Sequence, residues 1–376
     1  MTKTWNREAW SALLTIVITM VLWIVVKFVL SLNLSFFNPI SEALDNYQLT
    51  DLYFNIHSSA RQGEVQTAAA SDVVIIDIAG INTRSEISQL LQRVGEAEPR
   101  IVALDIIFGK ASSINQEEND SLVSVISGLP NLIIATNMVP SSDTAFTAER
   151  SFFSDEQWAT EAVTNLEYGI VRHFMPLQVF GNDTLYSLSK MIADRSNIIM
   201  PATTQPLLID YTLPQGMILS GKEQWDAGYL KDKVVLVGDR GDLRDQFAVP
   251  VTMHGEKRVA GVDIHRQILA TAAAGHIFSQ TPKALEIAIG ILLVFLSTLL
   301  SIVIRRRNMQ NRKMSDVAIG WLLNLMQLAF IIVSVAVAYC LMWGFHVLFS
   351  VKYIIVGFAL IEMIEKLKRD IMKWKS

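Results

Sequence analysis

The stretch Lys233-Val234-Val235-Leu236-Val237-Gly238 has four consecutive aliphatic side chains between a lysine and a glycine. Such a run suits a strand that is buried on both faces of a sheet. An acidic turn follows at 239–245, and residues 262–270 carry apolar side chains at the spacing of a helix with one buried face. The sequence therefore predicts a core strand, a turn and a helix in direct succession.

An apolar run, 284–304, comes shortly afterwards and contains a single charge, Glu286. As a helix, this segment would be about 31 Å long, which is the thickness of the hydrocarbon core of a bilayer. We therefore expect a folded α/β domain that is joined by a short connection to a membrane helix. This arrangement is typical of a sensor.

The composition requires two environments. The chain has 376 residues, of which 51% are hydrophobic, too many for one soluble domain. Residues 33–283 hold 18 Lys and Arg against 30 Asp and Glu, whereas the remaining residues are net basic. An acidic domain argues against a nucleic-acid partner, which requires a basic face. The only cysteine, Cys340, lies in an apolar run, so no intrachain disulfide can form.

The hydropathy pattern predicts four transmembrane helices, one before the acidic domain and three after it. The first is preceded by Lys3 and Arg7 and is longer than the apolar region of a signal peptide, so we expect an uncleaved anchor. The expected segments are a cytoplasmic amino terminus 1–10, span 11–32, extracytoplasmic domain 33–283, span 284–304, basic cytoplasmic loop 305–316, span 317–342, span 347–364 and basic cytoplasmic tail 365–376.

The positive-inside rule gives one orientation for this pattern. The amino terminus, the loop with Arg305-Arg306-Arg307 and the carboxyl tail are all basic, and four crossings place them on one side. The acidic domain 33–283 and the short turn 343–346 share the other side. We therefore expect a multi-pass membrane protein with both termini in the cytoplasm and residues 33–283 outside the cytoplasm. The lipid bilayer is accordingly an expected partner.

Strand and helix patterns alternate within residues 33–283. Three strand–helix repeats are expected, with strands at 72–78, 99–108 and 131–136 and helices at 83–96 and 117–127. Residues 140–166 read as irregular or weakly helical. Further elements are expected at 168–174, 185–193, 207–210 and 233–238. The fold class predicted is an α/β domain with a mostly parallel sheet and helices on both faces, together with the four transmembrane helices.

The ordered motifs of this domain resemble those of the type-two CHASE family. They are the strand end at Asp77, Pro99-x5-Asp105-Ile106-x-Phe108, Gly169-x-Val171-Arg172-x3-Pro176, Lys233-x-Val235-x2-Val237-Gly238, Asp245-x4-Pro250 and Gly261-Val262-x-Ile264-His265. The resemblance implies an extracytoplasmic sensory domain of a bacterial receptor, placed after one membrane helix and before up to three more. It therefore implies a protein of the bacterial inner membrane with residues 33–283 in the periplasm. It also implies a signal passed to a cytoplasmic kinase, cyclase or phosphatase.

Two features depart from the family pattern. Family members often carry alanine after the histidine of the last motif, whereas this chain has Arg266. Receptors of the family usually carry an output module after the last span, whereas about a dozen residues follow Ile364 here. The resemblance therefore implies a stand-alone member that signals to a separately encoded partner, either a cytoplasmic effector or another membrane protein. A homodimer is possible by analogy with other transmembrane receptors.

Polar side chains at the strand ends are the candidate ligand-binding residues. Open α/β sheets bind ligands at the carboxyl ends of their strands, where several acids and an arginine can converge. Two interpretations stay open, because an aspartate at a strand end also caps the following helix or pairs with an arginine. His265 is either a pH sensor or a histidine that is hydrogen-bonded within the fold. The candidates are Asp77, Asp105, Asn137, Arg172, Asp239, Asp245 and His265.

Metal and cofactor sites are not expected. Asp239, Asp242 and Asp245 lack the spacing of a calcium loop, and neighbouring arginines offset their charge. Residues 216–223 imitate a phosphate-binding loop but end in Glu223, where Ser or Thr would hold magnesium. The sequence contains no Gly-x-Ser-x-Gly, His-Glu-x-x-His or paired-cysteine pattern, so we expect no enzyme.

Two functional classes are consistent with these observations. The first is an integral membrane receptor that detects an extracytoplasmic ligand or protein and transmits the signal to its partner. The second is a scaffold or accessory subunit of a cell-envelope complex, whose domain binds protein without switching. A further alternative, an extracytoplasmic enzyme or permease accessory, lacks any motif that supports it.

Overall fold

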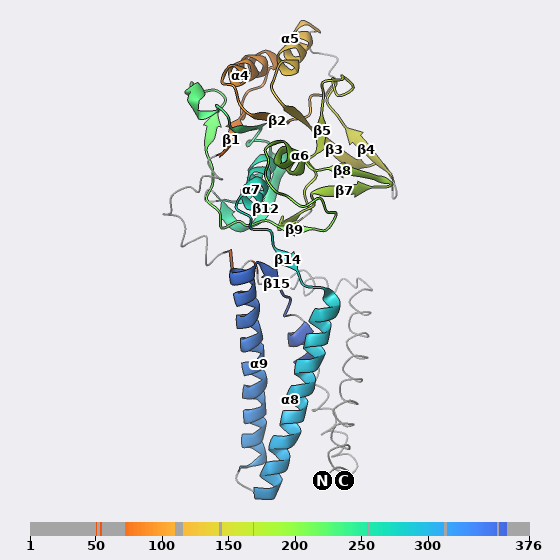
Figure 1. Cartoon of the computed structure of the whole chain (residues 1–376), viewed down its shortest axis with the longest axis vertical. Helices are drawn as coiled ribbons and strands as arrows, with labels where there is room; N and C mark the ends of the chain where they lie inside the picture. Colours follow the sequence, from red (N-terminus) through yellow and green to blue (C-terminus); the bar gives the residue numbers. More distant parts are fainter. Residues whose placement is uncertain are drawn as a thin grey trace. The chain divides into compact units, whose positions relative to one another are not determined.

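The computed structural model describes residues 50, 53–54, 72–109, 116–142, 145–167, 169–253, 256–311, 314–351 and 353–358. The chain divides into two compact units. We call Leu49–Ile277 the α/β unit, and we call Met1–Gln48 together with Phe278–Ser376 the helical unit. Figure 1 shows their elements along the chain. The two units are described separately.

A mainly parallel sheet forms the centre of the α/β unit. Its strand order is β10-β1-β11-β2-β3-β4, and β5 also pairs with β3. Only the β3–β4 pairing is antiparallel within this sheet. The predicted α/β class is confirmed for this unit. The strands are β1 (Val73–Asp77), β2 (Ile101–Asp105), β3 (Leu132–Pro140), β4 (Phe146–Glu149), β5 (Glu161–Val163), β10 (Ile218–Ser220) and β11 (Val234–Gly238).

Helices cover both faces of the sheet (Figure 1). Helices α4 (Arg84–Glu96) and α5 (Gln116–Ser127) follow β1 and β2 and pack together on one face. On the other face, α7 (Gly261–Ala273) contacts β1 and β11, and α6 (Leu188–Arg195) contacts β2, β3 and β5. The strand β11 lies between β1 and β2 although it comes much later in the sequence. The aliphatic run Val234–Val237 therefore lies in a central strand of the sheet.

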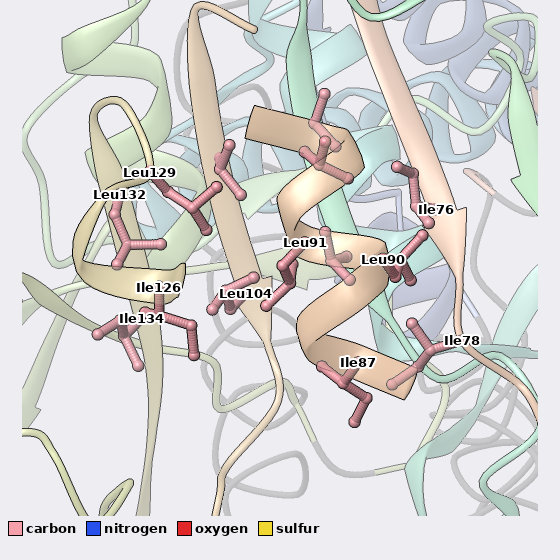
Figure 2. Close-up of a cluster of buried hydrophobic side chains, with 14 of the residues drawn as sticks. Ile76, Ile78, Ile87, Leu90, Leu91, Leu104, Ile126, Leu129, Leu132 and Ile134 are labelled. Atoms are coloured by element: carbon pink, nitrogen blue, oxygen red, sulfur yellow. The ribbon is translucent and has the colours of Figure 1, made fainter. Parts of the chain in front are cut away.

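The core under α4 and α5 follows from the alternation of the strands. Alternate residues of the strands point to this face, and α4 places Leu90 and Leu91 against them (Figure 2). Both leucines are at most 1% exposed. At about 1.5–3 kcal/mol for each fully buried aliphatic side chain, such contacts are the main stabilising term of the unit. The helix begins with a capping box, in which Thr83 and Glu86 satisfy each other's backbone N–H groups.

Several elements of the α/β unit were not predicted. Residues 140–166, expected to be irregular or weakly helical, contribute β4 and β5 to the sheet, so that expectation was wrong. Two hairpins were also missed. The strands at 177–180 and 183–186 have four residues each, and the strand at 246–253 contains Pro250, so neither hairpin gives a regular alternating signal. The strands outside the main sheet are β6 (His173–Phe174), β7 (Leu177–Phe180), β8 (Asp183–Tyr186), β9 (Leu207–Leu208), β12 (Gln246–Met253) and β13 (Glu256–Ala260).

The helical unit contains two helices that are long and apolar enough to cross a membrane. They are α8 (Lys283–Asn311) and α9 (Asp316–Phe345). Four such helices were predicted, and two are found among the described residues. The first predicted span, 11–32, lies outside the described residues. Of the fourth, 347–364, residues 353–358 are helical, residue 352 and residues 359–364 lie outside the described part, and Val347–Leu348 form the strand β15 instead.

The bounds of the two long helices also differ from the prediction. Helix α8 continues through Arg305–Arg307 to Asn311, so these arginines lie on a helix and not in a loop. Helix α9 continues to Phe345 and ends at His346, whose left-handed backbone closes the helix. The apolar run alone marks the membrane-compatible part of a helix, whereas the helix itself extends into the flanking polar residues.

We predict that Gly238→Ala destabilises the protein by about 1–3 kcal/mol, the usual cost of overpacking a core. An added Cβ at Gly238 would lie 2.9 Å from Cβ of Val262 on α7, closer than packed carbon atoms approach. Gly109→Ala is the matched control, since its Cβ would meet no atom within 4 Å. Chemical denaturation of the two purified variants measures the difference; equal stabilities would contradict the tight seating of α7 on β11.

Candidate functional site

The candidate site lies at the carboxyl edge of the three central strands. The register places Asp77, Gly238 and Asp105 in one row across β1, β11 and β2. Alternation along the strands directs both aspartates toward the face that α7 covers. Since Gly238 has no side chain, the first turn of α7 occupies the space above it, with Val262 in close contact. The first turn of α7 is thus flanked by two acids.

Asp105, Asp245 and His265 form a cluster on one side of this turn. The carboxylate of Asp245 accepts a hydrogen bond from the backbone N–H of Gly261 at 3.0 Å and so caps α7. The carboxyl of Asp105 is close enough to raise the pKa of Asp245, and His265 is close enough to oppose that rise. The strand-end residue Asp105 thus lies close to two other candidates, Asp245 and His265, and not to the other strand-end residues with which it was expected to converge.

The ring of His265 is fully committed within the fold. Its Nδ1 lies 3.0 Å from Oγ of Ser189 on α6, and the ring also bonds to the backbone of Thr164. The side chain is 2% exposed. Burial lowers the pKa of His265 to about 4, although Asp245 and the bond to Thr164 act in the opposite direction. The histidine is therefore neutral at physiological pH and ties α7 to α6.

The two aspartates of the cluster hold their protons unusually well. Burial raises the pKa of Asp105 to about 7. Burial, followed by repulsion from Asp105, raises the pKa of Asp245 to about 7 as well. Two neighbouring carboxyls of this kind titrate as a pair, so near neutrality the pair gains or loses a proton readily. The cluster can therefore respond to pH or to a bound group that carries positive charge or donates hydrogen bonds.

Asp77 holds the other side of the turn through backbone contacts. One of its carboxylate oxygens accepts hydrogen bonds from the N–H groups of Ala79 and Arg240. The side chain of Arg240 then donates to Asp263 of α7 at 2.8 Å. For Asp77, the structural interpretation is the one that the contacts favour.

The other predicted residues lie elsewhere. Asp239 accepts a bond from the N–H of Gly241 within its own turn, and Asn137 donates to Glu149 of β4. Arg172 is buried; its backbone N–H donates to Glu167, and its charge lies close enough to Tyr211 to affect the pKa of that phenol. Arg172 was predicted to be the counter-charge of the strand-end acids. No arginine is among the groups that shift the pKa values of Asp105 and Asp245.

Two charged contacts were missed by the sequence analysis. Asp263 is 1% exposed and lies between Arg240 and Arg266, and burial lowers the pKa of Arg266 to about 10. The i, i+3 spacing of Asp263 and Arg266 was the available signal for this pair. At the other end of α7, Nδ1 of His276 lies 2.6 Å from the buried carboxylate of Asp210.

Metal ligands do not gather at this site. Among the described residues, no group of three or more His, Cys, Asp or Glu side chains is arranged to hold a metal ion. The acids of the 239–245 turn are used individually, Asp242 by Arg244 and Asp245 by the amino terminus of α7. Residues 218–220 of the apparent phosphate loop form β10.

Comparison with protein families gives one match. The model of the CHASE2 domain matches residues 15–303 of this chain. The chain belongs to the CHASE2 family. CHASE2 domains are extracytoplasmic sensory domains of membrane receptors. Neither the comparison with curated proteins nor the comparison with solved structures gave a significant match. The family thus supports a sensory role for the α/β unit of this CHASE2 protein, and the resemblance seen in the sequence is confirmed.

We predict that Asp105→Asn removes a stability loss that the unmodified protein suffers at rising pH. A raised folded-state pKa means that stability is fully present below about pH 4, the unfolded value, and is lost as the pH rises through about 7. At pH 8 the variant should therefore be more stable by roughly 1–2 kcal/mol, with little difference at pH 4.

The measurement is urea unfolding of the detergent-solubilised chain between pH 4 and 8. The lowered pKa of His265 acts oppositely, since it adds stability as the pH rises from about 4 to 6.5, but it is common to both proteins and cancels in the difference. Asp183→Asn, at an exposed position on β8, is the matched control. A pH profile for Asp105→Asn that parallels the unmodified protein would contradict the raised pKa.

Proposed function

We propose that this CHASE2 protein is an integral membrane sensor that detects an extracytoplasmic signal and transmits it to a cytoplasmic partner protein. The observation that carries the proposal is the position of α7. Its first turn lies in the acidic cluster, and nine residues separate its last residue from the first residue of α8. One helix therefore links the candidate site to a helix that can cross a membrane.

The packing of α7 supports a role in transmission. The helix has 13 residues, so it is about 20 Å long, and all but its last residue are buried. Polar contacts hold it at both ends: Asp245 bonds to its amino terminus, and the Asp210–His276 pair lies just beyond its carboxyl terminus. A close-packed helix moves as a body, because packed interiors rearrange between discrete positions and do not deform continuously. A change in charge at the cluster that shifts α7 would therefore also displace the connection to α8.

The proposed topology has four membrane spans, with residues 33–283 outside the cytoplasm and both termini inside. The acidic domain, the arginines at the end of α8 and the positive-inside rule support this arrangement. The proposal assigns no reaction to this chain, since the partner would supply the output. Association of two copies is compatible with the proposal.

We predict that a protease added to intact spheroplasts cleaves the α/β unit and spares the segment Arg305–Arg307. The reason is that three consecutive arginines remain on the cytoplasmic side under the positive-inside rule. Immunoblotting with antibodies to each segment detects the products, and lysed spheroplasts provide the control in which both segments are cleaved. Protection of the α/β unit in intact spheroplasts would overturn the proposed sidedness, and with it the receptor.

We predict that a panel of small solutes, screened by thermal shift on the full detergent-solubilised chain, contains a specific stabiliser. A ligand at a hundred times its Kd stabilises the folded state by about 2.7 kcal/mol, which is roughly 5–10 °C for a unit of this size. Asp245→Asn should abolish the shift, because asparagine keeps the cap on Gly261 but loses the charge. Asp183→Asn should leave the shift unchanged.

The alternative, a scaffold subunit, is favoured by one feature of the α/β unit. The side chains of Phe146 on β4 and of Val179 and Tyr186 on the β7–β8 hairpin are 42–55% exposed. The ring centroids of Phe146 and Phe180 lie 5.1 Å apart, so the two elements are in contact. Exposed apolar side chains on adjacent hairpins are typical of a protein-binding surface. If no solute stabilised the chain and it co-purified only with structural proteins of the envelope, the scaffold would replace the sensor.

A further inference from the structure

The segment that leaves the α/β unit is hydrogen-bonded to the turn after α9. In the helical unit, β14 (Ser279–Gln280) pairs in parallel with β15 (Val347–Leu348). The N–H of Ser279 donates to the carbonyl of His346 at 2.9 Å, and the N–H of Thr281 donates to the carbonyl of Leu348 at 3.0 Å. The ring of Phe278, which is 1% exposed, packs edge-on against His346. The exit segment thus contacts the connection between the third and fourth predicted spans.

Glu286 reinforces this contact from the first turn of α8. Its side chain is buried, and a single oxygen, Oε1, accepts two hydrogen bonds from different parts of the chain. One comes from the hydroxyl of Thr281 at 2.6 Å, and the other comes from the backbone N–H of Ser350 at 2.9 Å. The hydroxyl of Thr281 also lies 2.9 Å from the carbonyl of Leu348. The acid that interrupts the apolar run is therefore the centre of a small network, which we call the outer clamp (Ser279, Thr281, Glu286, Leu348 and Ser350).

Close packing continues from the outer clamp along α8. A Cβ added at Gly357 would lie 2.7 Å from a methyl group of Val294, and one added at Gly290 would lie 3.5 Å from Tyr353. The contacts repeat every four residues on two helices, at 290 and 294 on α8 and at 353 and 357 on the short helix formed by residues 353–358. Each helix contributes one glycine that faces a larger side chain of the other, and a small residue in such a place lets two helices approach closely in a membrane. Ile354 and Phe358 complete the buried cluster with Val294.

We propose that the outer clamp joins α8 and the 346–358 segment into one mechanical element, so that a displacement of the exit segment reaches the third and fourth predicted spans together with α8. The inference rests on the proposed function in taking α8 and α9 as membrane spans. It deepens that function, because the chain does not join the third and fourth predicted spans to the α/β unit directly. Glu286 acts as a positioning residue, since it holds two segments that lie 64 residues apart.

The test is hydrogen exchange of individual amides in the full chain, reconstituted in lipid nanodiscs. Three amides report on the clamp: Ser279 and Thr281, which donate to backbone carbonyls, and Ser350, which donates to Glu286. Glu286→Ala removes the acceptor of Ser350 directly. If the clamp is one cooperative element, the amides of Ser279 and Thr281 should also exchange at least about tenfold faster, although their own acceptors remain.

Matched variants separate hydrogen bonding from disruption of the fold. Glu286→Gln keeps an oxygen at the same position, so exchange should stay within about threefold of the unmodified protein. Thr281→Val removes the hydroxyl at nearly constant volume and should accelerate the Ser350 amide, whereas Thr281→Ser keeps the hydroxyl and should not. Unchanged exchange in β1 and β11 confirms in each case that the α/β unit is folded.

A perturbation inside the α/β unit tests transmission. His276→Ala removes the partner of Asp210 two residues before Phe278. The amides of Ser279 and Ser350 should then exchange faster by similar factors. The reason is that the outer clamp couples the exit segment to the segment after α9, so that loosening of the first also loosens the second. Acceleration of Ser279 alone, or of Ser350 alone in Glu286→Ala, would overturn the proposal. These exchange measurements need no bound ligand. The outer clamp can therefore be disproved while the solute screen supports the sensor, and the screen can fail while the exchange data support the clamp.

Discussion

The seating of the first turn of α7 on the end of β11 is the constraint on which the α/β unit depends. Gly238 leaves room for Val262, and the aspartates that end β1 and β2 lie on either side of that contact. The turn brings Asp263, His265 and Arg266 into the interior, each at most 2% exposed. Burying such groups costs several kcal/mol unless each one is hydrogen-bonded or paired. Only a sheet with an extensive apolar core on its other face can offset this cost, and the α4 and α5 layer supplies that core.

The sequence predicted the elements whose signal is local and periodic. Leu90 and Leu91 are buried as the helical spacing required, and Val234–Val237 form a strand that is buried on both faces. What could not be predicted was the placement of β11 between β1 and β2, since nothing local specifies the order of strands in a sheet. Short strands such as β5 form because they pair with β3, so their structure is decided by tertiary contacts and not by their own propensity.

The candidate site shows the same division. The carboxyl-edge rule grouped Asp105 with the other strand-end residues, whereas the structure places it beside Asp245 and His265, which came from separate motifs. The rule does not indicate which of these acids are already hydrogen-bonded to backbone N–H groups. Asp77 and Asp239 bond to N–H groups of nearby turns, whereas Asp105 accepts no hydrogen bond from the described part of the chain. Side-chain placement, which the sequence does not encode locally, therefore separates an acid that supports a turn from one whose proton affinity is raised.

The two helices that would carry a signal begin in a related way. At the start of α7, Asp245 accepts the N–H of Gly261 from 16 residues further along the chain; at the start of α8, Glu286 accepts the N–H of Ser350 from 64 residues further along. In both places a carboxylate, favoured by the helix dipole, fixes the first turn to a distant segment. Such a bond is directional and is lost when the carboxyl group is displaced, whereas apolar contacts along a helix tolerate sliding. Acids at the first turns therefore fix the axial position of both helices, which is the coordinate that a piston-like or rotary signal has to change.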